Sequence, residues 1–182
     1  MTEYRGRRKK AEEVQEQTNT GETQNQEEQA KVIQANAVKI LRVKGGKMPE
    51  KKTSGAAAYD CYARGKHYLA DGDCGIVVPL GFKMEIPEGY HADVRMRSGL
   101  GVKTGLRASL GVGTIDSDYR GEVGMVFDRI HTRALGKNYD IINDGDRIAQ
   151  LLIYKDSDGP LIEVDELSDT ERGESGFGST GV

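Results

Sequence analysis

The sequence contains few of the residues that mark secreted, membrane or metal-cage proteins. Only two of its 182 residues are cysteines, Cys61 and Cys74, and they lack the paired spacing of a zinc site. No apolar run approaches the roughly 20 residues that a membrane-spanning helix needs, and the chain opens without an apolar signal segment. The net charge of -3 gives no chain-wide positive field for duplex DNA. We therefore expect a soluble, reduced, intracellular protein with no membrane role and no stable nucleic-acid partner for its core.

Proline is also scarce, with 4 residues, and tryptophan is absent, whereas glycine occurs 24 times. Glycine populates backbone conformations that other residues avoid and lets a backbone approach another group closely. This composition indicates a chain that turns often and contacts something at short range. A length of 182 residues favours one folded domain with tails.

The polar character of the chain divides it into three parts. Residues 1–36 are rich in Gln, Glu, Asn, Thr and Lys, which predicts a disordered or partly helical extension. Residues 37–165 carry the apolar runs of a β domain, and residues 166–182 form a polar, glycine-rich arm. The basic run at 5–10 fits either a solvated tail or a nuclear address, so we expect a cytoplasmic location and leave a nuclear one open.

Short apolar runs rich in β-branched residues, separated by turn residues, predict strands. The expected strands are residues 38–43, 76–85, 92–97, 123–129, 147–154 and 162–164. Many short strands without alternating helices favour an all-β sandwich or barrel over a nucleotide-binding α/β fold.

The glycine-rich end of the chain, residues 172–181, almost matches two phosphate-binding patterns. Ser179 occupies the position of the P-loop lysine, and a GxGxxG match at 176–181 is followed by a single residue, so no helix can follow it. An arginine, two hydroxyl groups and open backbone N–H groups could still wrap a phosphate, with Phe177 offering a flat face to a base. A flexible tail is the alternative.

Two internal clusters could also handle anions. Residues 95–101 predict a strand entering a tight turn with two arginines and a hydroxyl group, although solvated arginines at a strand end explain the same pattern. Residues 110–124 predict a glycine-bracketed hairpin in which Asp116 and Asp118 share one face and Tyr119 takes the other. One of these carboxylates could act as a general base, or the segment could be an ordinary Asp-rich turn.

Taken in order, these clusters resemble the five motifs of the trimeric dUTP pyrophosphatases, over roughly residues 38–182. The matching segments are 57–60 (AAYD), 97–99 (RSG), 113–121 (GTIDSDYRG), 145–150 (GDRIAQ) and 172–181 (RGESGFGSTG). The resemblance implies a jelly-roll subunit that forms a homotrimer, with active sites built from more than one subunit. It implies hydrolysis of dUTP to dUMP and pyrophosphate, which limits uracil in DNA and supplies dUMP for thymidylate synthesis.

The resemblance also implies a role for each motif. Asp116 would be the general base for the water that attacks the α-phosphate, Tyr119 would exclude a 2′-hydroxyl group, and Asp60 would reach Mg²⁺ through water. The remaining expected substrate contacts are Arg97, Ser98, Gly99 and Gln150 at the α- and β-phosphates, Gly113 and Gly124 at the uracil edge, and the arm residues Arg172, Phe177, Gly178, Ser179 and Thr180. In this arm Phe177 would stack on uracil, while the arginine and hydroxyl groups would hold the γ-phosphate.

Two other functions stay open at this point. The protein could be a regulatory binder whose contact with a partner switches with nucleotide occupancy, for which the extension at 1–36 is the natural contact segment. It could also be a dCTP deaminase sharing the same β fold, although the hairpin at 110–124 and the long arm fit pyrophosphate cleavage better.

Overall fold

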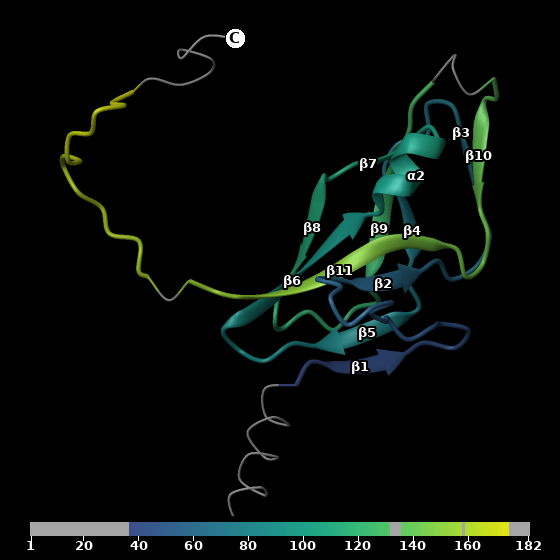
Figure 1. The fold of residues 1–182 in the computed structure, drawn as a ribbon, viewed down its shortest axis with the longest axis horizontal. Helices are drawn as coiled ribbons and strands as arrows, with labels where there is room; N and C mark the ends of the chain where they lie inside the picture. The colour runs from purple at the N-terminus through teal and green to yellow at the C-terminus, as the bar shows by residue number, and fades with distance from the viewer. Residues whose placement is uncertain (1–36, 132–135, 158, 175–182) are drawn as a thin grey trace, which may run out of the picture.

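The computed structural model describes residues 37–131, 136–157 and 159–174. The predicted extension at 1–36, with its basic run, lies outside these ranges. The expectation of an all-β domain is confirmed, because antiparallel strands dominate the described residues (Figure 1). The elements in chain order are β1 (Lys39–Arg42), β2 (Tyr59–Tyr62), β3 (His67–Ala70), β4 (Ile76–Pro79), β5 (Phe82–Glu85), β6 (Tyr90–Met96), α2 (Ser98–Lys103), β7 (Leu106–Ala108), β8 (Val112–Ile115), β9 (Gly124–Arg129), β10 (Tyr139–Ile142) and β11 (Arg147–Lys155).

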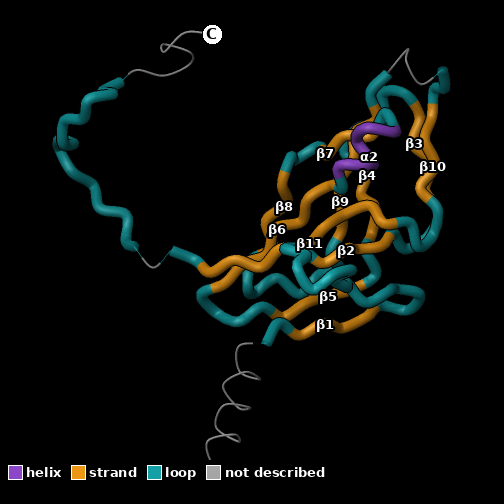
Figure 2. The backbone as a smooth tube through the Cα atoms, in the orientation of Figure 1, coloured by secondary structure: helices purple, strands orange, loops and turns teal. Residues whose placement is uncertain are grey.

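Four small sheets make up the domain, and every strand pairing between these elements is antiparallel. Figure 2 shows the strands gathered in the folded body, with loops connecting them. The largest has the strand order β2-β11-β6-β8, and a second has the order β4-β9-β7. The pairs β1-β5 and β10-β3 complete the body. α2 is too short to cross a membrane, and no helix in the described ranges is long and apolar enough to do so.

The core lies where these sheets face one another, because buried side chains alternate along the strands. In β9 the inward positions are Met125, Phe127 and Arg129, at the period of two that a half-buried strand requires. Nearly every strand contributes to one hydrophobic cluster. Its largest fully buried side chains are Phe82, Phe127, Leu69, Leu80, Leu106, Ile142, Ile148, Val78, Val94 and Val123.

Four of the predicted strands are confirmed with small shifts at their ends, as β1, β6, β9 and β11. The prediction of one strand over 76–85 is wrong, because the chain breaks into β4 and β5 at Gly81, whose φ of 77° lies in the left-handed region. The prediction of a strand at 162–164 is also wrong. These residues have no regular structure, and Ile162 is 75% exposed.

The predicted hairpin over 110–124 is a third correction. β8 pairs with β6 in the largest sheet, whereas β9 pairs with β4 and β7 in another. Residues 116–123 therefore connect two sheets, and Asp116 and Asp118 lie in a turn after the strand rather than on an extended strand. The backbone N–H of Tyr119 donates to the carbonyl oxygen of Asp116 at 3.2 Å, which closes that turn.

The loop after β1 crosses the β4-β5 turn at a contact between two backbones. A Cβ atom on Gly46 would overlap the carbonyl oxygen of Gly81, an approach that no side chain tolerates. The N–H of Val43 donates to the same carbonyl oxygen at 2.9 Å. The crossing therefore requires glycine at position 46 and fixes the start of the β1-β2 connection.

Candidate active site

Asp60 is the centre of the first polar cluster. It lies on β2, is nearly buried, and faces β11 in register with Gln150. Its Oδ1 is 3.2 Å from Nε of Arg97 and accepts a hydrogen bond from Nε2 of Gln150 at 3.4 Å, and its Oδ2 accepts one from Nη1 of Arg147 at 3.0 Å. Three residues predicted separately from the sequence, Asp60, Arg97 and Gln150, are thus brought together.

Arg147 is the member of this cluster that sequence reasoning did not select. It lies inside the motif at 145–150, but the sequence does not indicate which acidic side chain it pairs with. The structure pairs its guanidinium with Asp60, so one carboxylate serves two arginines.

Arg97 is placed by the junction between β6 and α2. Its backbone is extended, with φ of -69° and ψ of 135°, and its N–H donates to the carbonyl oxygen of Ile148 on β11 at 3.1 Å. Ser98 and Gly99 follow in the first turn of α2 and lie at the surface. The predicted tight turn at 95–101 is therefore a short helix, and its accessible first turn directly follows Arg97.

A second polar group surrounds a cavity of about 310 Å³ between the two larger sheets. Asp116, Tyr119 and Gly124, three predicted site residues, line it. Its other lining residues are Val77, Thr114, Ile115, Glu122, Val123 and Val126. Gly113 lies next to this lining on β8, opposite Val94 of β6. The cavity combines apolar walls with two carboxylates and an exposed phenol ring, which suits an amphipathic ligand.

Close contacts with glycine shape this cavity. A Cβ atom on Gly124 would lie 2.9 Å from Cγ1 of Val77, and one on Gly121 would overlap the hydroxyl oxygen of Tyr119. The Tyr119 hydroxyl group also donates to the carbonyl oxygen of Glu122 at 3.2 Å. The phenol ring is thus held over Gly121, where no side chain competes with it.

Glu122 anchors the far side of the cavity. It makes a two-point ion pair with Arg64, in which Nε and Nη2 each lie 2.7 Å from a carboxylate oxygen, and it accepts a hydrogen bond from the N–H of Gly81 at 3.0 Å. The hydrogen bonds from Arg64 are the main reason that the pKa of Glu122 lies below its ordinary value of 4.5. This carboxylate is therefore a charged structural anchor at neutral pH.

The two polar groups lie at opposite ends of the β6-β8 pair. Arg97 lies two residues after Arg95, which faces Val112 at the start of β8. Asp116 directly follows Ile115, which faces Ala92, so Asp116 lies level with His91, six residues before Arg97. At about 3.3 Å per strand residue, these six residues separate the two polar groups by roughly 20 Å. One chain does not bring its two polar groups together.

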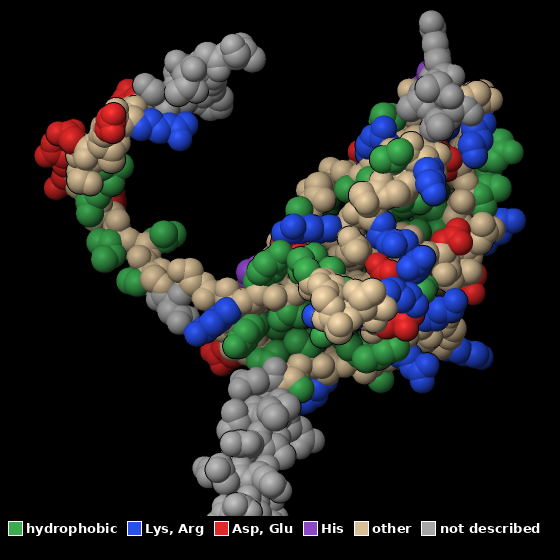
Figure 3. Space-filling view, in the orientation of Figure 1, with side chains coloured by type: hydrophobic (Ala, Val, Ile, Leu, Met, Phe, Trp, Pro, Cys, Tyr) green, Lys and Arg blue, Asp and Glu red, His purple; other side chains and the backbone are tan. Residues whose placement is uncertain are grey.

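The arm leaves the body after β11. Residues 159–174 are exposed and run away from the sheets (Figure 1). Arg172 lies in this segment, whereas Phe177, Gly178, Ser179 and Thr180 fall outside the described residues. Hydrophobic side chains stand out along this segment in Figure 3, and Leu161, Ile162, Val164 and Leu167 are each more than half exposed.

A family model for dUTPase matches residues 44–181 of this sequence. The chain belongs to the dUTPase family. A deoxyuridine 5′-triphosphate nucleotidohydrolase of Fusobacterium nucleatum is 41% identical over 145 residues, which cover 79% of this chain and 96% of that protein. One of Beijerinckia indica is 42% identical over 146 residues, covering 79% of this chain and 88% of the relative.

Solved dUTPase structures share the fold. The dUTPase of Staphylococcus bacteriophage 80alpha with dUpNHpp superimposes with a TM-score of 0.70 and 29% identity, covering 81% of this chain and 99% of that one. A mutant dUTPase from phage phi11 of S. aureus, described as coordinating a structural Mg(II) ion, gives a TM-score of 0.65 and 25% identity, with 74% and 100% coverage. The antiparallel architecture is the expected jelly roll.

Within this single chain, some of the dUTPase motifs are already in contact. The motifs at 57–60, 97–99 and 145–150 meet around Asp60, and the motif at 113–121 builds the cavity wall. Thr114 and Glu122 line the cavity and belong to the cluster at 110–124, although neither was selected as a site residue. Val77 lies outside every motif, and only its place in the fold brings it to the cavity.

Proposed function

We propose that this chain hydrolyses dUTP to dUMP and pyrophosphate through water attack on the α-phosphate. The observation that carries the proposal is that motifs from distant segments of the chain come together as two groups, each suited to one part of a nucleotide. One is a cavity beside a carboxylate and a phenol ring, and the other is a cluster of arginine and amide groups. The first half suits a deoxyuridine and the second suits phosphates.

The cavity half would bind the nucleoside. The ring of Tyr119, held by its hydrogen bond to the carbonyl oxygen of Glu122, packs against the deoxyribose and leaves no room for a 2′-hydroxyl group. Backbone groups around Gly113 and Gly124 recognise the uracil edge, since glycine permits close approach. Gly124 and Val77 both line the cavity, and a Cβ atom at position 124 would already lie 2.9 Å from Cγ1 of Val77, so space is short here and a base without a 5-methyl group is favoured.

The cluster half would bind the α- and β-phosphates. Arg97, the Ser98 hydroxyl group, the Gly99 N–H and the amide of Gln150 are the donors. Arg97 and Gln150 are oriented by Asp60 before substrate arrives. Such preorganised donors need little rearrangement when negative charge enters the site.

Asp116 would activate the water. Its carboxylate at the cavity accepts a proton from water while the water oxygen bonds to the α-phosphorus. The bond from the α-phosphorus to the oxygen bridging the α- and β-phosphates breaks, and its electron pair leaves with pyrophosphate. Asp116 afterwards returns the proton to solvent.

Asp60 would hold Mg²⁺ through a water molecule. Asp60 already accepts hydrogen bonds from Arg147 and Gln150 and forms an ion pair with Arg97, so direct binding of a metal ion would displace one of these partners. In the described ranges, no group of three or more His, Cys, Asp or Glu side chains could hold a metal unaided. When bound, the ion supplies positive charge that offsets the charge of the phosphate oxygens.

A homotrimer would unite the two halves. They are separated by roughly 20 Å within one chain, which exceeds the reach of a nucleoside to its own α-phosphate, so the water-activating carboxylate and the phosphate cluster of one site come from different copies. The exposed apolar side chains at 161–167 and a cavity of about 530 Å³ beside β1 and β11 are surfaces that an assembly would cover.

The arm at 166–182 would close the assembled site. Arg172, Ser179 and Thr180 would hold the γ-phosphate, with Phe177 stacked on uracil and Gly178 beside it. Closure would exclude bulk water from the reacting phosphate. An intracellular location remains a prediction, supported by two unpaired cysteines, and membership of the dUTPase family ranks deamination of dCTP below dUTP hydrolysis.

Steady-state assays with dUTP, UTP, dCTP and dTTP test the proposal. We expect pyrophosphate from dUTP in the presence of Mg²⁺ and at least about a hundredfold lower kcat/KM with the other three nucleotides. The absence of pyrophosphate from dUTP, or release of ammonia from dCTP, would overturn it.

A further inference from the structure

The helix that carries Ser98 and Gly99 is too short to hold itself in place. α2 has six residues, no fully buried residue, and no side-chain hydrogen bond at its N-cap. Isolated helices of this length are unstable in water, so tertiary contacts must fix α2. Most of its polar anchors lie at the opposite end from the proposed phosphate contacts.

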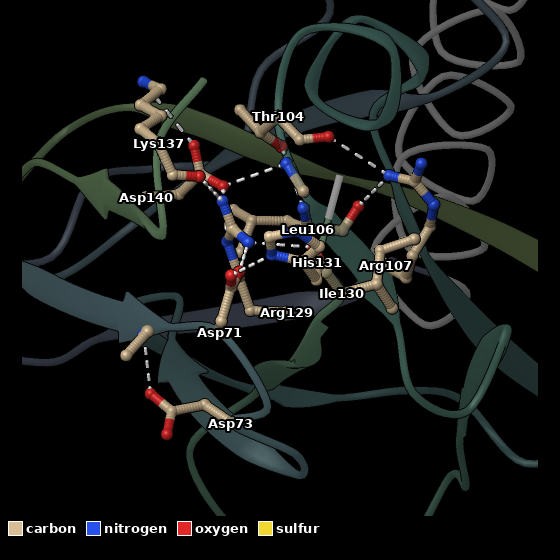
Figure 4. A network of polar contacts seen from close by, with 12 residues as sticks. Asp71, Asp73, Thr104, Leu106, Arg107, Arg129, Ile130, His131, Lys137 and Asp140 are labelled. Carbon is tan, nitrogen blue, oxygen red and sulfur yellow. Dashed lines mark hydrogen bonds and ion pairs between the residues drawn. The ribbon is translucent and has the colours of Figure 1, made fainter. Parts of the chain in front are cut away.

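Arg107 closes that end of the helix. Its Nη1 donates to the carbonyl oxygens of Thr104 at 3.2 Å and Leu106 at 2.6 Å (Figure 4). It also donates to the carbonyl oxygen of Gly101 at 3.0 Å. Carbonyl groups in the last turn of a helix lack partners within it, and a basic side chain satisfies them. The Thr104 hydroxyl group adds a bond to the carbonyl oxygen of Leu100 at 2.6 Å and accepts one from the N–H of Leu106 at 3.1 Å.

A buried ion pair holds the residue that follows. The N–H of Gly105 donates to Oδ2 of Asp140 at 2.9 Å, and the same oxygen lies 3.2 Å from Nε of Arg129. Arg129 is fully buried, contacts Asp71, and donates to the carbonyl oxygens of Ile130 and Lys137 at 2.9 and 2.7 Å (Figure 4).

Gly105 fits against this arginine without spare room. A Cβ atom at position 105 would lie 2.7 Å from the carbonyl oxygen of Ile130 and 2.9 Å from the guanidinium of Arg129. The backbone at the end of α2 therefore rests directly on a side chain that two carboxylates and two carbonyl groups hold in place.

We infer that the four residues that hold the end of α2, together the α2 clasp, are positioning residues for the phosphate half of the proposed active site. They are Thr104, Arg107, Arg129 and Asp140. They touch no substrate group, and they act by fixing the helix whose first turn presents Ser98 and Gly99. The inference rests on the proposed function. A helix of this length spans about 9 Å, so a tilt at the clasp moves its first turn relative to Asp60 and Gln150 on β2 and β11.

The test compares a phosphate-bearing ligand with one that lacks phosphates. Calorimetric affinities for dUpNHpp with Mg²⁺ and for deoxyuridine are measured in the full chain and in Arg107→Met, with Arg42→Met on exposed β1 as the matched control. We expect Arg107→Met to lower the affinity for dUpNHpp about 5- to 10-fold and the affinity for deoxyuridine by less than about 2-fold. The effect is modest because each hydrogen bond of a charged group contributes little net energy. Arg107→Lys, which keeps a donor, should recover most of the loss, and Arg42→Met should match the unchanged protein.

Thr104→Val provides a second variant that keeps the side-chain shape and removes both hydroxyl bonds, so the same selective loss is expected from it. An equal loss of affinity for dUpNHpp and for deoxyuridine would overturn the role of the clasp. So would an unchanged affinity for dUpNHpp in both Arg107→Met and Thr104→Val. If the unchanged protein binds neither ligand, the proposed function itself fails, and with it the site that α2 would position.

Discussion

Oδ1 of Asp60 lies 3.2 Å from Nε of Arg97, although 37 positions separate the two residues in the sequence. The arginine therefore has a defined orientation before any phosphate arrives. A phosphate that binds Arg97 meets a guanidinium whose position is already fixed, which lowers the ordering cost of binding.

The first prediction concerns the proposed base. Asp116→Asn should lower kcat for dUTP by at least about 100-fold with little change in affinity for dUpNHpp, because the amide keeps the shape but cannot accept the proton. Single-turnover kinetics and calorimetry separate the two effects. Asp118→Asn, in the same turn, is the control and should stay within about 3-fold of the unchanged enzyme. Loss of activity that weaker binding explains would remove Asp116 from the mechanism.

The second prediction follows from the two separated halves. Arg97→Ala and Asp116→Asn should each be almost inactive alone, and joint refolding of the two variants should restore a measurable part of the activity, since mixed assemblies contain some intact sites. The assay is pyrophosphate release before and after mixing. If the mixture stays as inactive as its components, both halves of a site come from one chain.

The third prediction concerns sugar selection. Gly121→Ala places a methyl group against the Tyr119 ring, where the new Cβ position overlaps the hydroxyl oxygen, so the ring must move. We expect the preference for dUTP over UTP to fall about 10-fold. Tyr119→Phe keeps the ring and loses only its bond to Glu122, so it should retain most of the preference. An unaltered preference in Gly121→Ala would argue against sugar exclusion by this ring.

The fourth prediction is a pH dependence of stability. Arg64 holds the pKa of Glu122 below 4.5, so this ion pair stabilises the fold fully above that pH, and the contribution disappears as pH falls through the lowered pKa. Glu122→Gln should cost about 1 kcal/mol of unfolding free energy at pH 7, allowing for partial exposure of the pair, and the difference should shrink at a pH well below the ordinary pKa of 4.5. Urea unfolding at both pH values measures it.

Glu85→Gln is the control for that experiment, because Glu85 forms an exposed pair with Lys39. Its unfolding curve should stay close to that of the unchanged protein at both pH values. A difference for Glu122→Gln that persists at low pH would mean that packing, not charge, is responsible.

The fifth prediction distinguishes the two thiols. Burial, with Asp60 nearby, raises the pKa of Cys61 to about 12, whereas Cys74 is exposed. A thiol reagent at about pH 8 should therefore modify one cysteine per native chain and two in denaturant. Cys74→Ser should leave none reactive in the native state. Rapid modification of that variant would show that the β2 region opens easily.

Much of the fold was predictable because long strands carry their own pattern. β9 alternates buried and partly buried residues over six positions, which is enough for a period of two to be recognised. β11 does not alternate throughout, because a bulge between Arg147 and Ala149 leaves Ile148 and Ala149 both buried, but its apolar run over nine residues predicts a strand by length and composition. β2, β3, β7, β8 and β10 have three or four residues each, and a run such as Tyr-Asp-Cys-Tyr is too short and too polar to give that signal. Only their partners define them as strands.

The candidate site was predictable in its residues but not in its pairings. Sequence selected Asp60, Arg97 and Gln150 through their motifs, whereas the ion pair with Arg147 depends on how β2 and β11 align. The hairpin predicted at 110–124 failed for a related reason. Glycines bracket a change of direction, but they do not determine which sheet receives the next strand.

The crossing of Gly46 and Gly81 restricts how this protein can be redesigned. Because one backbone rests on the other, neither residue can acquire a side chain, and no compensating change elsewhere creates the missing space. The β1-β2 connection can be altered in its exposed lysines, but a graft or insertion must leave residue 46 in place. In a sequence library, we expect position 46 to return as glycine even where its neighbours vary freely.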